Sequence, residues 1–274
     1  MRLSEAQIRQ YQDQGYLFPI PALSPAAAAD YRRRLESAEA QGEEIRKLLR
    51  NKPHLLLTFL DELVRHPAVL DAVEGVIGPN ILCWASSFFT KEPQTTDFIS
   101  WHQDLTYWGL EPADIGTAWI ALSPSSPESG CMRVVPGTHT QEVAPHRDTF
   151  GEHNMLSRGQ EIAVEVEEDH AVDVVLQPGE MSLHHVKLFH GSNPNHSADR
   201  RIGFAVRYLP TYVRQTVGEK DSALLVRGVD SYGNFEQERP PAADLDPDAL
   251  AHHKAICERQ AQILFRGTDR AGVR

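Results

Sequence analysis

Residues of types that bind metal ions stand at spacings that predict one reactive centre. His102 and Asp104 are two residues apart, and in an extended segment two such side chains point to the same side. His190 follows much later in the chain, beside a glycine and beyond several predicted strands. Two histidines and one carboxylate on one face of an octahedral ion leave other positions open, which is typical of non-haem Fe(II) oxygenases. The spacing predicts a metal site formed by His102, Asp104 and His190.

Other histidines compete for the third position. The chain contains 13 histidines, so one His-x-Asp pair is weak evidence by itself. His184 and His185 are alternative third ligands, and either could instead be a strand-end histidine that bonds to the backbone. His139, in the turn Pro136-Gly137-Thr138-His139, is interpreted as structural.

A second chemical feature is Arg201, eleven residues after His190. The planar fork of an arginine binds a carboxylate through two hydrogen bonds, as the far end of a 2-oxoglutarate co-substrate requires. In a strand over 201–209, Arg201 would share one face with small residues that leave room for a ligand. The alternative is a surface salt bridge. Arg200 has the opposite parity and is expected to face solvent.

The elements that must position these residues change character along the chain. The first 75 residues are expected to be helical. A capping box at Ser4 and an N-cap at Ser24 begin two helices, the second over 26–49. Two shorter helices are predicted at 57–64 and 67–76, and a last one over 246–265.

From residue 81 onward, short β-rich runs bounded by turn residues predict a mainly β fold with flanking helices. This pattern predicts a double-stranded β-helix, or cupin-like jelly roll. The whole chain, 1–274, is expected to be one domain, with a helical part at 1–78, a jelly-roll core at 79–210 and a C-terminal extension and helix at 211–274. The predicted strands are 81–91, 116–122, 132–135, 171–176, 181–185 and 202–209.

Composition limits the class of protein. The chain has 274 residues, of which 41% are hydrophobic, and its net charge is −11 without any basic run. Such a chain is not expected to bind nucleic acid, and no apolar run approaches the roughly 20 residues of a membrane helix. The polar N-terminus lacks the apolar stretch of a secretory signal. The three cysteines suggest neither a disulfide framework nor a paired zinc motif. A cytoplasmic location follows as the expectation, whereas the oligomeric state is not predicted.

Four blocks together resemble the phytanoyl-CoA dioxygenase family of Fe(II)/2-oxoglutarate oxygenases, over residues 3 to about 210. Their order and spacing are more specific than any one of them. They are Leu3-Ser4-Glu5-Ala6-Gln7-Ile8 with Gly15-Tyr16-Leu17, Trp101-His102-Gln103-Asp104, Pro127 to His139, and His190-Gly191-Ser192 through Asn195 and Ser197 to Arg201.

The resemblance implies roles for individual residues. His102, Asp104 and His190 would bind the iron, and Arg201 the distal carboxylate of 2-oxoglutarate. The other residues to which the resemblance or the local pattern gives a role are Ser192, Trp119, Lys91 and Gln103 near the co-substrate, and Tyr107, Trp108, Arg133 and Arg207 in the substrate pocket.

The resemblance implies a dioxygenase that uses Fe(II), 2-oxoglutarate and O2 and hydroxylates a small molecule, releasing succinate and CO2. Halogenating relatives have a small residue where Asp104 stands, so hydroxylation is favoured over chlorination. Desaturation, cyclisation or epimerisation on the same iron centre is the alternative, and a non-catalytic jelly-roll binding protein is a further one. Substrate specificity is expected to lie in the loops of 141–172 and in the segment after Pro210. No polybasic site for the phosphates of a CoA ester is evident.

Overall fold

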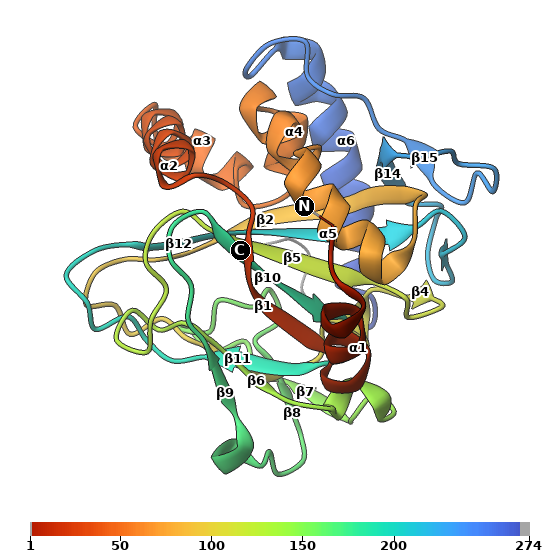
Figure 1. Ribbon diagram of the computed structural model, residues 1–274. Helices are drawn as coiled ribbons and strands as arrows, with labels where there is room; N and C mark the ends of the chain where they lie inside the picture. Colours follow the sequence, from red (N-terminus) through yellow and green to blue (C-terminus); the bar gives the residue numbers. More distant parts are fainter. Residues whose placement is uncertain (1, 269–274) are drawn as a thin grey trace.

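Two β-sheets face each other in the computed structural model, which describes residues 2–268. The larger has the strand order β1-β10-β5-β12-β2-β14-β15 and the smaller the order β3-β11-β6-β9. Figure 1 shows the small sheet below the large one and most helices above it. The double-stranded β-helix expected from the sequence is confirmed.

The strands of the large sheet are β1 (Tyr16–Pro21), β2 (Ile81–Lys91), β5 (Gly116–Ala121), β10 (Glu180–His185), β12 (Arg201–Pro210), β14 (Ser222–Arg227) and β15 (Glu236–Gln237). Those of the small sheet are β3 (Ile99–His102), β6 (Met132–Val135), β9 (Val172–Val174) and β11 (Phe189–Ser192). Two further pairs are β4 (Leu110–Glu111) with β13 (Arg214–Gln215), and β7 (His146–Asp148) with β8 (Gln160–Ile162).

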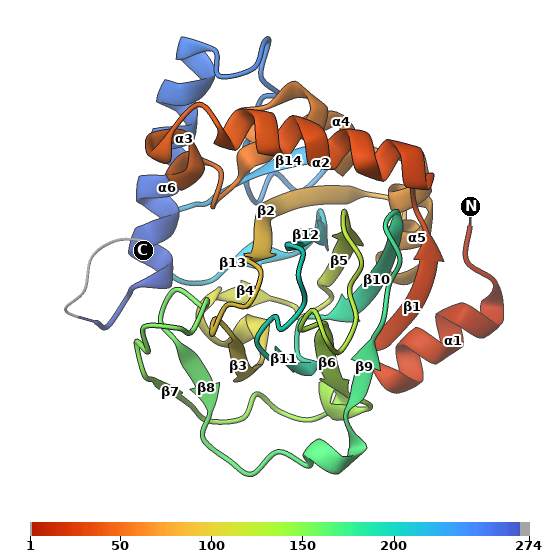
Figure 2. The ribbon, with the colours of Figure 1, turned by 90° about the vertical axis from the view of Figure 1, so that its left-hand side faces the viewer.

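Helices cover the outer face of the large sheet, and α2 crosses it in Figure 2. The α-helices are α1 (Glu5–Gln14), α2 (Pro25–Glu39), α3 (Glu43–Leu48), α4 (Thr58–Val64), α5 (Pro67–Ile77) and α6 (Pro247–Leu264). Short 3-10 turns are η1 (Pro53–Leu55), η2 (Asp104–Tyr107), η3 (Thr138–Thr140) and η4 (Glu168–His170). Among the described residues, no helix has the length and apolar character needed to cross a membrane.

One expected helix and the expected extent of the sheet differ from the structure. The helix predicted over 26–49 is two helices, because Gly42, with φ of 136°, breaks the chain between α2 and α3. The large sheet also extends beyond 79–210, since β1 precedes this range and β14 and β15 follow it. The sequence therefore located the central strands but underestimated how much of each terminal part joins the sheet.

The strand β12 lies in the middle of the large sheet, and all its residues are buried. Ile202, Phe204, Val206 and Tyr208 pack into the largest hydrophobic cluster, which also contains residues of the helices. Alternate residues, including Arg201 and Arg207, line a cavity between the two sheets. The two-residue period expected for this strand thus divides an apolar face from a functional one.

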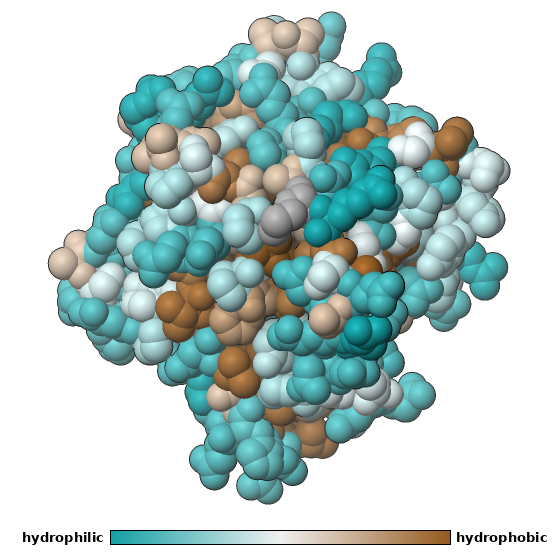
Figure 3. Space-filling model, in the orientation of Figure 1, coloured by the Kyte–Doolittle hydropathy of each residue, from teal (hydrophilic) through white to brown (hydrophobic). Residues whose placement is uncertain are grey.

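The surface is largely hydrophilic on the face seen in Figure 3, with hydrophobic residues scattered among the polar ones. Arg200, which was expected to face solvent, instead makes ion pairs with Glu39 at 2.9 Å and Glu92 at 2.9 Å. Its side chain is 20% exposed. The parity was right in directing Arg200 away from the cavity, but helix α2 covers that face.

A fully buried ion pair ties the C-terminal extension to the rest of the fold. Lys52 Nζ lies 2.5 Å from Glu238 Oε1, and both side chains are inaccessible to solvent. Ser222 Oγ donates a further hydrogen bond of 2.8 Å to the same carboxylate oxygen. The pair connects the segment before α4 with strands β14 and β15.

Glu238→Ala is expected to lower the free energy of unfolding by about 3–5 kcal/mol, because it leaves the Lys52 ammonium buried and unpaired. Urea denaturation measures this loss. The double variant Lys52→Met with Glu238→Leu should lose less than Glu238→Ala alone. An unchanged urea midpoint in Glu238→Ala would contradict the stabilising role.

The same pair predicts a pH dependence. Burial would raise the pKa of Glu238, but Lys52 and His54 outweigh burial and lower it to about 2. A carboxyl with a lowered pKa stabilises the fold fully above its unfolded pKa of about 4.3, and that contribution is lost as the pH falls toward the folded value. Between pH 5 and 2, the wild type should therefore lose more stability than Glu238→Ala does, as measured by thermal unfolding.

Candidate metal and co-substrate site

The two predicted histidine ligands stand directly opposite each other on neighbouring strands. His102 ends β3 and pairs in register with His190 of β11. His102 Nδ1 lies 2.9 Å from the carbonyl oxygen of Ser100, and His190 Nδ1 lies 2.9 Å from that of Leu188. A carbonyl can only accept, so each Nδ1 carries the proton and donates it. Each Nε2 is thereby left with a lone pair for a metal ion.

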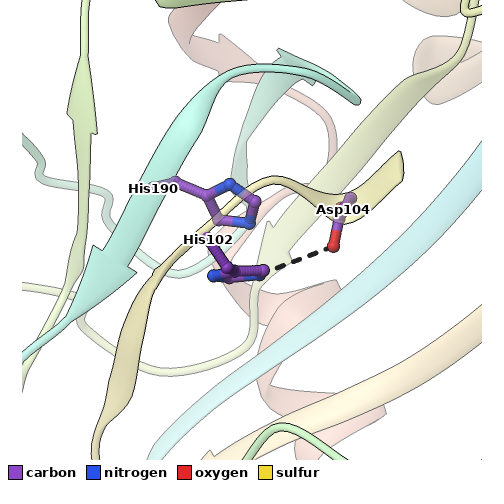
Figure 4. A group of neighbouring side chains, drawn as sticks. All are labelled: His102, Asp104 and His190. Carbon is purple, nitrogen blue, oxygen red and sulfur yellow. Dashed lines mark ion pairs between the residues drawn. The ribbon is translucent and has the colours of Figure 1, made fainter. Parts of the chain in front are cut away.

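Asp104 completes the group. One ligand atom from each of His102, Asp104 and His190 lies within 4.8 Å of the others, and Figure 4 shows the three side chains converging. Asp104 Oδ1 is 3.5 Å from His102 Nε2. Burial would raise the pKa of Asp104, but the neighbouring imidazoles and the Arg207 guanidinium hold it well below its usual range. Burial lowers the pKa of His190, which favours the neutral imidazole that a metal ion requires.

The local backbone at Asp104 differs from the expectation. His102 and Asp104 were expected on one side of an extended segment, whereas β3 ends at His102 and Asp104 begins the 3-10 turn η2. The carboxylate still reaches the imidazoles because the turn bends the chain across the end of the strand. The juxtaposition was predicted correctly, but the stated reason was wrong.

The competing histidines have other surroundings. His184 of β10 lines the same cavity, with Nε2 4.0 Å from Asp104 Oδ2, yet it is not part of the three-residue group. His185 accepts a hydrogen bond of 3.1 Å from the Lys187 amide through Nδ1. His139 bonds through Nε2 to the carbonyl of Gln12 at 2.9 Å. The geometry therefore favours His190 as the third ligand.

Arg201 lies in the cavity as a buried cation with free donors. Its side chain is 1% exposed, and its Nε and Nη2 have no hydrogen-bond partner among the described residues. The guanidinium lies 5.3 Å from the centre of the Trp119 ring. Gly203 provides the space for that ring, because an added Cβ would lie 1.8 Å from Trp119 Cζ2. Buried donors without partners are rare, so this end of the cavity is suited to an anion.

Lys91 and Ser192 border Arg201. Lys91 stands opposite Arg201 in the pairing of β2 with β12. Its Nζ donates to Ser192 Oγ at 2.6 Å and also to the carbonyl of Asn193. Burial, with the Arg201 charge second, lowers the pKa of Lys91 to about 6. Both residues therefore lie near the predicted co-substrate position, and Ser192 lines the cavity directly.

Two of the predicted site residues point elsewhere. The Gln103 side chain is buried away from the cavity, donating 2.8 Å to the Lys187 carbonyl and accepting 2.8 Å from the Ala144 amide. Arg133 makes an ion pair of 2.8 Å with Glu168. Its position in β6 is opposite in parity to Met132, which lines the cavity. The partner of Arg133 lies 35 residues away and could not be predicted from the local sequence.

The two aromatic residues after the motif also serve packing. Tyr107 donates a hydrogen bond of 2.7 Å to Asp148 and lies under the Arg158 guanidinium, 3.8 Å from ring centre to Cζ. Trp108 packs against Trp84 with ring centres 4.8 Å apart. Neither lines the cavity, which contains about 400 Å³ of space not filled by atoms, part of it open to solvent.

Thr117 is a cavity residue that the sequence analysis missed. It lies on β5 and lines the cavity together with Arg207, which was predicted as a pocket residue. Its signal was available in principle, because Thr117 and Trp119 share one face of the predicted strand 116–122. A threonine in a predicted strand cannot be assigned to a site until the pairing of its strand with the neighbouring strands is known.

Comparison with known proteins places this geometry in a family. Residues 4–203 match the family described as phytanoyl-CoA dioxygenase (PhyH). The chain belongs to the phytanoyl-CoA dioxygenase family. The expectation from the sequence motifs is thus confirmed, and the His-Asp-His group lies within the matched residues.

Relatives of this family member include a probable alpha-ketoglutarate-dependent hypophosphite dioxygenase of Stutzerimonas stutzeri, 31% identical over 72% of this chain. The peroxisomal phytanoyl-CoA dioxygenase of Homo sapiens is 33% identical over 49% of this chain. These matches span 66% and 42% of the relatives' own lengths. A solved non-heme monooxygenase, ThoJ in its apo form, is 34% identical with a TM-score of 0.84, covering 94% of this chain and 97% of that one.

Gly203→Ala is expected to weaken 2-oxoglutarate binding and to lower the melting temperature, since the new methyl group displaces the Trp119 ring that contacts Arg201. Overpacking of this kind destabilises by about 1–3 kcal/mol. Thermal unfolding and 2-oxoglutarate titration measure the two effects.

Gly116→Ala is the matched control. Gly116 also lies in the large sheet, but its nearest atom to an added Cβ is the Tyr11 hydroxyl at 3.4 Å, an ordinary contact. Equal behaviour of the two variants would show that the close approach of Trp119 to Gly203 is unimportant.

Proposed function

We propose that this family member is a non-haem Fe(II)- and 2-oxoglutarate-dependent dioxygenase that hydroxylates a C–H bond of a small molecule, with release of succinate and CO2. The observation that carries the proposal is the buried Arg201, with two unpartnered guanidinium nitrogens, in the same cavity as the His102, Asp104 and His190 group. A metal-binding protein without a co-substrate has no need of this arginine.

The residues present fit a divalent iron. Two neutral imidazoles and one carboxylate supply three donors and leave the remaining positions of an octahedral ion for other ligands. The backbone carbonyls of Ser100 and Leu188 fix the orientation of both rings before any metal binds. A solved ThoJ complex with nickel, 30% identical and with a TM-score of 0.80, supports metal binding by this fold.

The residues also fit 2-oxoglutarate. Arg201 offers a planar fork to a carboxylate, and the Trp119 ring holds that fork from one side. Ser192, which accepts from Lys91, can donate its own hydroxyl proton to the same carboxylate. Burial excludes water from this end of the cavity, which strengthens each of these contacts.

Bound iron with 2-oxoglutarate and O2 supplies the oxidising chemistry of this family. The chain's own residues would bind the metal ion, orient the co-substrate and exclude water. His102, Asp104 and His190 would hold the ion, and Arg201 would orient the co-substrate. Asp104 occupies a position that a halide would need, which supports hydroxylation over halogenation. The cavity walls limit the substrate to a small molecule.

The relatives differ in what they act on, as their names state: hypophosphite, phytanoyl-CoA and 1-deoxypentalenic acid. An acyl-CoA is the least suitable of these for this chain, because its phosphates would need free cations. Two arginines outside the cavity, Arg133 and Arg214, make ion pairs with Glu168 and Glu111. A small metabolite or natural-product intermediate fits better.

Anaerobic addition of Fe(II) and 2-oxoglutarate to the apo-protein should produce a visible charge-transfer band. Asp104→Ala and His190→Ala should abolish it. Arg201→Gln should weaken 2-oxoglutarate binding about tenfold to a hundredfold, because a hydrogen bond to a charged group contributes about 1.5–3 kcal/mol. Arg200→Gln, a neighbouring arginine outside the cavity, is the matched control and should leave the band unchanged. If the wild type shows no band at any iron concentration, the proposal fails.

The reaction type is tested by the product mass. Hydroxylation adds one oxygen atom, taken from 18O2, to a substrate found by screening for succinate release. Desaturation, cyclisation or epimerisation on the same centre adds none. A product that contains no labelled oxygen would replace hydroxylation by one of these outcomes.

A further inference from the structure

Three polar side chains lie in one row across the cavity face of the large sheet. Arg207 of β12 stands opposite Thr117 of β5, and Thr117 stands opposite His184 of β10. Neighbouring strands are about 4.8 Å apart, so the row spans roughly 10 Å. All three residues line the same cavity as the predicted iron ligands. We refer to them as the Arg207–Thr117–His184 row.

Each member of the row has a buried polar atom without a hydrogen-bond partner among the described residues. These atoms are Nε of Arg207, Oγ1 of Thr117 and Nδ1 of His184. The side chains are almost inaccessible, with exposures of 8%, 1% and 2%. Buried polar atoms are nearly always satisfied in folded proteins. Three unsatisfied ones side by side in a cavity indicate that a ligand completes them.

The Arg207 guanidinium is held in place without a direct ion pair, and the Asp104 charge acts on it from a distance. Its Nη1 donates to Ser87 Oγ at 2.8 Å. The rings of Phe89 and Trp108 lie 5.4 Å and 5.9 Å from its Cζ. It makes no ion pair within 4.0 Å with any residue that the structure describes. A rigid, buried and unpaired guanidinium is a binding site for an oxyanion.

The co-substrate held by Arg201 cannot also satisfy Arg207. The two arginines lie on the same face of β12, six residues apart in sequence, which separates their Cα atoms by roughly 20 Å along a strand. Only the small residues Gly203 and Ala205 lie between them on that face. A five-carbon dicarboxylate is much shorter than this distance. The row therefore needs a different ligand, on the far side of the metal group.

Charge balance favours a monoanion. A divalent metal and Arg201 together balance Asp104 and a 2-oxoglutarate dianion, so the charge of Arg207 remains. Burying a net charge is costly. A single negative charge on the second ligand would compensate it.

We propose that the Arg207–Thr117–His184 row is the subsite for the primary substrate, and that it takes an oxyanion headgroup, either a carboxylate or a phosphorus oxyanion. The substrate is then a small acid, anchored at the row so that the rest of the molecule extends toward the metal. The inference rests on the proposed function, because it requires the metal and 2-oxoglutarate to occupy the other end of the cavity.

The test is calorimetric titration of the anaerobic protein, loaded with Fe(II) and 2-oxoglutarate, with sodium formate and with sodium hypophosphite. Formamide, which has the size of formate and no charge, is the ligand control. Wild type should bind at least one of the anions and bind formamide more weakly by about tenfold or more. The preferred anion distinguishes a carboxylate substrate from a phosphorus oxyanion.

Variants assign the binding to the row. Arg207→Gln should weaken anion binding about tenfold or more, and Thr117→Val, which keeps the shape and removes the hydroxyl, should weaken it less. Arg200→Gln should behave as wild type. The charge-transfer band of Fe(II) with 2-oxoglutarate should persist in all of them, which also shows that they are folded.

Two results would overturn the subsite. One is that neither anion binds to wild type that shows the charge-transfer band. The other is that Arg207→Gln binds anions like wild type but binds iron more weakly, which would make Arg207 a charge partner of Asp104. Absence of the band in wild type would refute the proposed function instead, so the two failures are distinguishable.

Discussion

Burial of β12 on both faces is the constraint on which the site depends. Every residue of this strand is buried, so the side chains on its two faces must suit two different buried environments. One face is apolar and packs under the helices. The other holds Arg201 and Arg207 in a cavity from which most water is excluded. Two buried guanidinium groups are costly unless they are compensated, and the protein supplies only part of that compensation through aromatic rings and Ser87.

The metal group has a similarly simple physical basis. In both β3 and β11, the histidine bonds through Nδ1 to the carbonyl of the residue two positions earlier. The strand backbone itself therefore selects the tautomer, and no distant residue is needed to orient either ring. The backbone positions Asp104 in a different way, because this residue lies beyond the end of β3 and its carboxylate must still point toward the imidazoles. The turn η2 gives it this direction.

Sequence alone could predict the parts of this arrangement that follow from local periodicity. The positions of the central strands, the cavity face of β12 and the convergence of His102, Asp104 and His190 all depend on spacing within a strand or on motifs. The positions of Arg133 and Arg200 could not be predicted in this way. Their partners, Glu168 and Glu39, are distant in sequence, so only the assembled fold decides which arginine is neutralised and which remains free.

The same limit applies to Tyr107. It follows the metal motif closely, which suggested a pocket residue, but its neighbour Arg158 comes from the 141–172 loop. Arg158 Nη1 also donates to the Leu264 carbonyl at the end of α6, at 3.1 Å.

These contacts link the C-terminal extension to the turn that carries Asp104. Helix α6 and the loop together hold Tyr107, the last residue of η2, and Asp104 is the first residue of that turn. A turn of four residues fixed at one end restricts the other. The C-terminal extension is thus connected, through Arg158 and Tyr107, to the turn that begins at Asp104.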